Sequence, residues 1–205
     1  MELNENDIFQ DHISISVDEF FELLEQKLLL KFELSNKILI YHQMATENHC
    51  TIESNIIGES RSLFIGQKYY KIFGESFAIT TPDLKTYYLP DASIVIAKDV
   101  KYVKVGENKQ VDAVSNAVGV IEILSDSTEN YDRTIKYENY KKIPTLKQYT
   151  LISQHKIQVE NFVKNASGEW KCTIYTSKND YFSVIEDQFK LKVGNLYLQT
   201  SLDEE

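Results

Sequence analysis

The run VGVIEILS, residues 118–125, sets the carboxylate of Glu122 inside an otherwise apolar strand. Side chains alternate along a strand, so Glu122 lies on one face while Ile121 and Ile123 lie on the other. Both faces are apolar enough to be buried. An ionised carboxylate is costly to bury unless a cation, a proton or a hydrogen-bond donor compensates it. We therefore expect Glu122 to have a specific partner.

The next segment, residues 127–142, offers candidate partners for that carboxylate. It is predicted to be a helix on which Asp132, Lys136 and Tyr140 fall at positions i, i+4 and i+8, forming one polar stripe. An aspartate and a lysine at this spacing commonly form only a solvated ion pair, worth roughly 0.3–0.5 kcal/mol. A buried glutamate can also pair with a lysine for stability alone.

A second acid comes from one of two Pro-Asp pairs. Pro82-Asp83 lies between two strand-like runs, where Pro and Asp are ordinary turn residues, so we assign it to structure. Asp91 instead heads the apolar run DASIVIA, where its side chain can point off the sheet into a cleft or cap the strand end. Two acids and a lysine at one end of a sheet are the minimum for metal-assisted hydrolysis of a phosphodiester.

Length and composition define the class of protein. A chain of 205 residues with 42% hydrophobic content predicts one domain, with 1–16 as an N-terminal extension and 203–205 as a tail. No apolar run approaches the roughly 20 residues of a membrane span, and the acidic N-terminus has no signal region, which predicts a cytoplasmic protein. Cys50 and Cys172 lie far apart and are expected to be reduced thiols.

The net charge of −9 argues against a broad, sequence-independent grip on nucleic acid, because phosphate affinity comes largely from Lys and Arg. Local clusters of lysine remain possible binding elements, although solvated faces are the more ordinary interpretation. The lysines concentrate in two segments, residues 101–109 and residues 136–147.

The pattern of apolar residues, turns and glycines predicts an α/β or α+β domain around a mixed sheet. Gly58 and Gly66 weaken the prediction of one continuous helix in the first half of the chain. In chain order we expect a helix over 17–30, a hairpin over 31–43, a helix over 46–71, strands over 76–80, 86–97 and 117–124, a helix over 127–142, and strands over 146–153, 155–164, 169–176 and 181–185.

Four stretches carry a resemblance to a known family. They are VDEFFELL at 17–24, LPDASIV at 89–95, VIEILSDST at 120–128, and YDRTIKYENYKKIPTLKQYTLI at 131–152. The chain resembles the Uma2 family of restriction endonucleases, a branch of the PD-(D/E)XK nuclease superfamily, from about Val17 to Leu202. The last two stretches are the specific ones, because they combine a strand of the form E-x-L-S with an acid, a lysine and a tyrosine on one helix stripe.

The resemblance implies a restriction-endonuclease-like αβββαβ core with a mixed central sheet, additional C-terminal β-hairpins and a cleft at one end. It further implies a divalent cation, Mg²⁺ or Mn²⁺, held by Asp91 and Glu122, to which we add the backbone carbonyl of Ile123. The implied activity is hydrolysis of phosphodiester bonds in nucleic acid, with DNA favoured, by a homodimer.

The resemblance also assigns roles to residues of the helix and of the N-terminal half. In the superfamily motif a lysine stands two residues after the second acid, but that position is Leu124 here. Lys136 matches the lysine that has moved to the helix, and it would position the attacking water. Supporting roles fall to Glu33, His49, Asp132 and Tyr140, with a helix-start or core histidine as the other interpretation of His49.

The chain departs from the family at two positions beside the expected site. Asp126 replaces the usual proline, and Ser153 replaces the aspartate that often follows the tyrosine strand. The acidic balance and the weak basic clusters of the chain favour an alternative function, a catalytically inactive binding module in which Glu122 and Lys136 form a structural ion pair.

Overall fold

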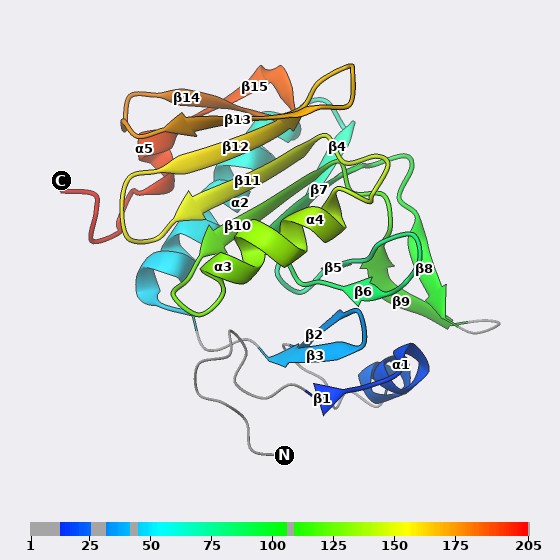
Figure 1. Ribbon diagram of the computed structural model, residues 1–205. Helices are drawn as coiled ribbons and strands as arrows, with labels where there is room; N and C mark the ends of the chain where they lie inside the picture. The colour runs from blue at the N-terminus through cyan, green and yellow to red at the C-terminus, as the bar shows by residue number, and fades with distance from the viewer. Residues whose placement is uncertain (1–12, 26–31, 42–44, 106–108, 205) are drawn as a thin grey trace.

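The computed structural model describes residues 13–25, 32–41, 45–105 and 109–204. Its centre is a six-stranded sheet with the order β13-β12-β11-β10-β7-β4 (Figure 1). β10 and β11 pair in parallel, whereas the other neighbouring strands pair antiparallel, so the sheet is mixed as predicted. The strands are β4 (Tyr70–Gly74), β7 (Ala92–Ile96), β10 (Gly119–Leu124), β11 (Gln148–Ser153), β12 (Val159–Lys164) and β13 (Trp170–Tyr175).

Helices cover both faces of this sheet (Figure 1). On one face lies α2 (Glu47–Phe64), together with the short α5 (Val193–Leu196). On the other lies a continuous helical segment made of α3 (Glu129–Tyr131), a π-helical turn (Asp132–Lys136) and α4 (Tyr137–Tyr140). The chain order α2, β4, β7, β10, α3 to α4, β11 confirms the expected αβββαβ core.

The alternation of β10 sorts its side chains between two buried clusters. Ile121 and Ile123 pack with α2, while Val120 and Leu124 pack with the α3 to α4 segment. Every residue of β10 is buried, including Glu122 at 3% exposure, which confirms that both faces of this strand are covered. Glu122 points to the α3 to α4 side, where the polar stripe of that segment meets it.

Smaller sheets surround the core. A four-stranded sheet with the order β1-β3-β2-β6 carries Glu33, and it lies beside α1 in Figure 1. Its hairpin turns at Asn36 and Lys37, both with positive φ, as the Ser-Asn pair predicts. The remaining elements are β1 (Ile13–Ser14), α1 (Val17–Glu25), β2 (Phe32–Ser35), β3 (Ile38–Tyr41), β5 (Ala78–Ile79), β6 (Thr86–Tyr87), β8 (Tyr102–Val105), β9 (Lys109–Val114), β14 (Tyr181–Val184) and β15 (Glu186–Lys192).

Several predicted boundaries are wrong. The helix expected over 46–71 ends at Phe64, and Tyr70 and Lys71 already belong to β4. The strand expected over 86–97 is divided into β6 and β7 around Pro90, which cannot donate to a sheet ladder. The segment between 97 and 117 holds the paired strands β8 and β9, and β15 was not predicted. The ends of the first helix and of the first hairpin, 26–30 and 42–43, lie outside the described residues.

Within the described part of the chain, no helix combines the length and the apolar character that crossing a membrane would need.

An ion pair fastens the α3 to α4 segment to the sheet. Both terminal nitrogens of Arg133 donate to the carboxylate of Glu160 on β12 at 2.7 Å, and Nε donates to Glu129 at 2.8 Å. The hydrogen bonds from Arg133 lower the pKa of Glu160 below its ordinary value, more than burial raises it. This pair therefore stabilises the fold above the unfolded-state pKa of glutamate, and the contribution is lost as the pH falls through the lowered pKa.

Replacing Arg133 with methionine is expected to lower the free energy of unfolding at pH 7 by about 1–3 kcal/mol, because charged hydrogen bonds are lost. The difference from the unchanged protein should shrink as the pH falls below about 4. Urea unfolding at pH 7 and pH 3 measures both values. Lys141→Met, which breaks an exposed pair with Glu138, is the control and should cost less than about 0.5 kcal/mol. An equal loss for Arg133→Met at both pH values would contradict the argument.

Candidate active site

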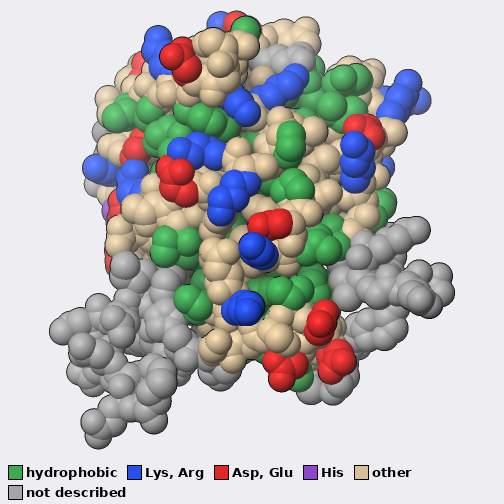
Figure 2. Space-filling model, turned by 45° about the vertical axis from the view of Figure 1, so that its right-hand side comes forward, with side chains coloured by type: hydrophobic (Ala, Val, Ile, Leu, Met, Phe, Trp, Pro, Cys, Tyr) green, Lys and Arg blue, Asp and Glu red, His purple; other side chains and the backbone are tan. Residues whose placement is uncertain are grey.

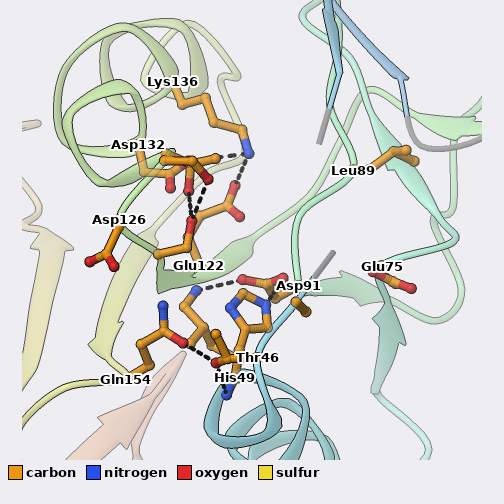
Figure 3. Close-up of a pocket in the computed structure, with 15 residues that line it drawn as sticks. Thr46, His49, Glu75, Leu89, Asp91, Glu122, Asp126, Asp132, Lys136 and Gln154 are labelled. Carbon is orange, nitrogen blue, oxygen red and sulfur yellow. Dashed lines mark hydrogen bonds and ion pairs between the residues drawn. The ribbon is translucent and has the colours of Figure 1, made fainter. Parts of the chain in front are cut away.

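A buried lysine organises the first half of the site. Lys136 is 1% exposed, and its Nζ lies 2.9 Å from Oε1 of Glu122, 3.1 Å from Oε1 of Glu33 and 3.3 Å from Oδ1 of Asp132. Figure 3 shows Lys136, Asp132 and Glu122 turned toward one another. The interpretation of Asp132 and Lys136 as a solvated pair is wrong, since both side chains are buried.

Three elements supply these side chains. Glu33 comes from β2, and its Oε1 also accepts a hydrogen bond of 2.7 Å from the backbone of Leu89. The hydroxyl of Tyr140 donates to Oε1 of Glu122 at 3.0 Å. The π-helical turn itself is held by Tyr149 on β11, whose hydroxyl donates to the Asp132 carbonyl at 2.9 Å. Such π-helical turns recur at functional sites.

Acids outnumber the cation in this buried group. Burial raises the pKa of Glu122 well above its ordinary value, and the charges of Asp132 and Asp91 add to this rise although Lys136 opposes it. Burial alone would lower the pKa of Lys136, but the carboxylates of Glu122, Glu33 and Asp132 outweigh it and raise that pKa. Lys136 is therefore cationic, and the acids around it repel one another.

The second half of the site is centred on Asp91. This residue directly precedes β7, whose Ala92 pairs with Ile121 of β10. Its Oδ2 accepts a hydrogen bond of 2.5 Å from the backbone nitrogen of Ile123, and its Oδ1 lies 2.9 Å from Nε2 of His49. Asp91 thus caps a strand N–H, as one interpretation expected, and it also lines the same pocket as Glu122.

His49 lies in the first turn of α2, which Thr46 caps. Burial lowers the pKa of His49, but the hydrogen bond and the charge of Asp91 outweigh it and raise the pKa above its ordinary value. The protonated ring therefore pairs with the Asp91 carboxylate more readily than a free histidine would. His49 is also a helix-start residue, as the other interpretation expected, because its backbone nitrogen donates to the capping Thr46 hydroxyl.

Both halves line one pocket of about 220 Å³. Figure 3 shows Asp91 and His49 on one side of it and Glu122, Asp132 and Lys136 on the other. Glu33 and Tyr140 contact Lys136 and Glu122 from outside the lining. The lining residues are Ala45, Thr46, His49, Glu75, Leu89, Asp91, Glu122, Ile123, Ser125, Asp126, Ser127, Thr128, Asp132, Lys136 and Gln154.

Gln154 is a pocket residue that the sequence reasoning did not select. Its Oε1 accepts a hydrogen bond from the hydroxyl of Thr46, which in turn accepts one of 3.2 Å from the His49 backbone. The Gln154 amide nitrogen therefore points away from Thr46, and Figure 3 shows it directed toward the pocket. A signal was present, because Gln154 directly follows β11, and the carboxyl ends of parallel neighbours such as β10 and β11 meet at one edge of a sheet.

The two departures from the family pattern lie close to this pocket. Asp126 lines it, but its side chain is 91% exposed and its carboxylate lies 2.9 Å from Nε2 of His155. Ser153 is buried at the end of β11, and its hydroxyl accepts a hydrogen bond from the His155 backbone. Among the described residues, neither of these two side chains forms a hydrogen bond or an ion pair with Glu122 or Lys136.

The pocket offers oxygen donors suited to a hard divalent cation. Asp91 and Glu122 contribute carboxylates, and the carbonyl of Ile123 points to the same side of β10 as its N–H, which faces Asp91. Mg²⁺ commonly takes one or two carboxylates and keeps several waters. No three His, Cys, Asp or Glu side chains of the described ranges form a metal-binding group. An ion would therefore take two carboxylates, the carbonyl and water, and this donor set fits Mg²⁺.

Comparisons with known proteins agree on the family and the fold. The family profile of Uma2, described as "Putative restriction endonuclease", matches residues 17–194. The "Uncharacterized protein sll1609" of Synechocystis is 31% identical over 135 residues, which cover 66% of this chain and 73% of that protein. A second Synechocystis protein, slr1290, is 28% identical over 109 residues, covering 53% and 54%.

A solved structure shares the fold. A protein of Anabaena variabilis described as "a putative nuclease belonging to DUF820" superimposes with a TM-score of 0.70 at 17% identity, over 89% of this chain and 97% of that one. This likeness confirms the restriction-endonuclease-like mixed sheet. The profile match spans most of the chain and includes β7, β10 and the α3 to α4 segment, and the chain accordingly belongs to the Uma2 family of restriction-endonuclease-like proteins.

Proposed function

We propose that this protein is a metal-dependent endonuclease that hydrolyses phosphodiester bonds of nucleic acid. The observation that carries the proposal is one pocket with Asp91 on one side and, on the other, the 2.9 Å contact between Glu122 and Lys136. Asp91, Glu122 and the Ile123 carbonyl would hold Mg²⁺ or Mn²⁺. The match to the Uma2 family and the description of the structural neighbour as "a putative nuclease" support the reaction class.

A bound divalent ion would supply Lewis-acid stabilisation of phosphate charge and a more acidic bound water. The chain's own residues then orient the reactants. Lys136 keeps a positive charge beside the pocket, because three carboxylates hold it there. That ammonium is suited to orient the attacking water and to offset charge that develops on the phosphate.

Lys136 must release one contact to do this. An ammonium has three N–H donors, and here three carboxylates surround it. The contact with Asp132 is the longest, at 3.3 Å, and Asp132 also lines the pocket. We assign Asp132 as the contact that opens toward substrate, while Glu33 keeps Lys136 in place. DNA is the favoured substrate, and a homodimer would supply the two sites needed to cut both strands.

The surrounded lysine also favours a second candidate function. If all three contacts persist, Lys136 is purely structural, and the domain is an inactive binding module. Metal binding separates the two functions, because only the nuclease needs the Asp91 and Glu122 oxygens for an ion.

Replacing Asp91 with asparagine is expected to weaken Mg²⁺ or Mn²⁺ binding roughly 10- to 100-fold and to reduce cleavage at least as much, because one carboxylate ligand loses its charge. Calorimetric titration measures binding, and plasmid and single-stranded DNA serve as cleavage substrates with Mg²⁺ or Mn²⁺ in excess over the protein. Asp83→Asn, in the other Pro-Asp pair, is the matched control and should leave both unchanged. An unchanged protein that neither binds the metal nor cleaves DNA in its presence would favour the binding module instead.

A further inference from the structure

A second groove lies between the C-terminal turn of α2 and β4. Its volume is about 350 Å³, and four consecutive strand residues, 70–73, line it. Successive strand residues point to opposite faces, so a groove that touches all four runs along the edge of the strand. β4 is a terminal strand of the six-stranded sheet, and this edge has no partner strand in the described part of the chain. The groove therefore follows an open sheet edge.

Three cations border this groove. Arg61 comes from the last turn of α2, Lys68 from the connection and Lys71 from β4, and all three are exposed. None of them forms an ion pair with another described residue, and no Asp or Glu is among the described residues that line the groove. Uncompensated positive charge is unusual in a chain with a net charge of −9. It marks a site complementary to an anion.

On the face drawn in Figure 2, the positive charge is interrupted. Figure 2 shows Lys and Arg side chains scattered over one face, with Asp, Glu and hydrophobic side chains among them. The lysine-rich segment 136–147 illustrates this, because Lys136 is buried and Lys141 pairs with Glu138 at 2.6 Å. The lysines of this segment therefore form a weaker positive cluster in the folded protein than their spacing in the sequence indicates.

The groove also has an apolar component. Ile65 is 73% exposed at its rim, and Phe73 forms part of its lining. Tyr69, beside the lining residues, is 48% exposed. Single strands are typically held by a positively charged groove together with aromatic or apolar side chains against which bases stack. The combination fits a strand with phosphates and bases better than it fits a simple anion.

The groove leads to the candidate active site. Phe73 lines the groove, whereas Glu75, just beyond the end of β4, lines the catalytic pocket, so two residues of chain, at most roughly 7 Å, separate them. Gly74 between them pairs with Ala92, the neighbour of Asp91. One extended chain could follow β4 from one site to the other, passing the exposed acid Glu75.

We propose that the groove along β4 binds a single strand of nucleic acid that flanks the bond to be cut, with Arg61, Lys68 and Lys71 on its phosphates. The inference rests on the proposed function, because it takes the catalytic pocket as the place of cleavage. A second copy of the chain fits less well, because pairing of two β4 edges would bring two sets of cations together. Like charges placed opposite each other destabilise a strand pair.

The test is binding of a fluorescein-labelled 25-nucleotide single strand, on the order of the site sizes of single-strand binding domains, measured by anisotropy in EDTA so that cleavage does not interfere. The variant Arg61→Glu/Lys68→Glu/Lys71→Glu is expected to bind at least about tenfold more weakly. Its plot of log K against log salt should be shallower by about 2, since each phosphate contact on a single strand contributes about 0.7.

The matched control reverses three other exposed lysines, Lys147, Lys171 and Lys190, and so makes the same change in net charge. It should change the affinity less than about threefold. An equal loss of affinity in both variants would mean that the strand is held by diffuse charge attraction. An unchanged affinity in the groove variant would mean that another surface binds the strand. Either result overturns the proposal. If polyglutamate bound as tightly as the labelled strand, and if the groove variant lost this binding too, the partner would be an acidic protein and the proposal would be overturned. If the groove variant loses binding but the unchanged protein cleaves nothing with metal, binding of a single strand by the groove stands by itself and the proposed function fails.

Discussion

Replacing Lys136 with methionine is expected to lower the free energy of unfolding at pH 7 by about 3–5 kcal/mol, as removal of one partner from a buried ion pair typically does. Methionine fills much of the same space but has no charge. The carboxylates of Glu33, Glu122 and Asp132 would remain buried without the cation that lies 2.9–3.3 Å from them. Each would have to ionise at high cost or bind a proton.

The loss should depend on pH in a defined direction. Burial already raises the pKa values of Glu122 and Asp132, and the variant also loses the opposing charge of Lys136. A carboxyl whose pKa is higher in the folded than in the unfolded state contributes stability below the unfolded value and loses it as the pH rises through the folded value. The variant should therefore be closest to the unchanged protein near pH 4 and furthest from it above pH 7.

Urea unfolding between pH 4 and pH 8 measures this dependence. Lys85→Met is the control, since Lys85 is 64% exposed and lies 3.9 Å from an exposed Asp83. It should cost less than about 0.5 kcal/mol at every pH. A pH-independent loss for Lys136→Met would mean that packing, rather than charge, makes Lys136 important to the fold.

The sequence predicted the central part of this arrangement for a physical reason. Glu122 stands in an apolar strand, and a buried carboxylate requires compensation, so a cation at helical spacing in the next element was the natural partner. The contact between Glu122 and Lys136 depends on local chain order, because β10 and the following helix are adjacent in sequence. Such short-range geometry follows from strand and helix periodicity.

The parts that depend on distant contacts were harder to predict from residues alone. Glu33 comes from the first hairpin and reaches Lys136 only because that hairpin packs beside the core, and its role came from the family resemblance. Gln154 was missed because a polar residue after a strand is ordinary in sequence and becomes notable only when Thr46 fixes its amide. The strands β8 and β9 were missed because polar residues there resemble a loop.

The groove along β4 illustrates the same limit. Arg61, Lys68 and Lys71 are separated along the chain and belong to a helix, a turn and a strand, so no charge run marks them. The sequence instead drew attention to the lysines of segment 136–147, one of which is buried and one paired with a neighbouring acid. Spatial clustering of charge is a property of the fold.

Replacing Glu122 with glutamine is expected to reduce cleavage by at least about 10³-fold, as losing several kcal/mol of charge stabilisation would. Its effect on stability should be the opposite of that of Lys136→Met. Glutamine keeps an oxygen that can accept from Tyr140 and Lys136, while the removed charge was one of three carboxylates around a single ammonium. The free energy of unfolding at pH 7 should stay within about 1 kcal/mol of the unchanged protein, or rise.

The two substitutions together decide between the nuclease and the binding module. If Glu122 serves as a metal ligand in an acid-rich pocket, Glu122→Gln gives a stable protein that neither cleaves nor binds Mg²⁺ with the original affinity. If Glu122 serves only as the structural partner of Lys136, Glu122→Gln loses several kcal/mol of stability and metal binding is absent from the start. Glu138→Gln changes an exposed acid of α4 and controls for the loss of one charge. If Glu122→Gln cleaved at the original rate, Glu122 would have no role in the reaction. The excess of buried acids over cations is what makes the first outcome the expected one, because a purely structural pair has no need of a second and a third carboxylate.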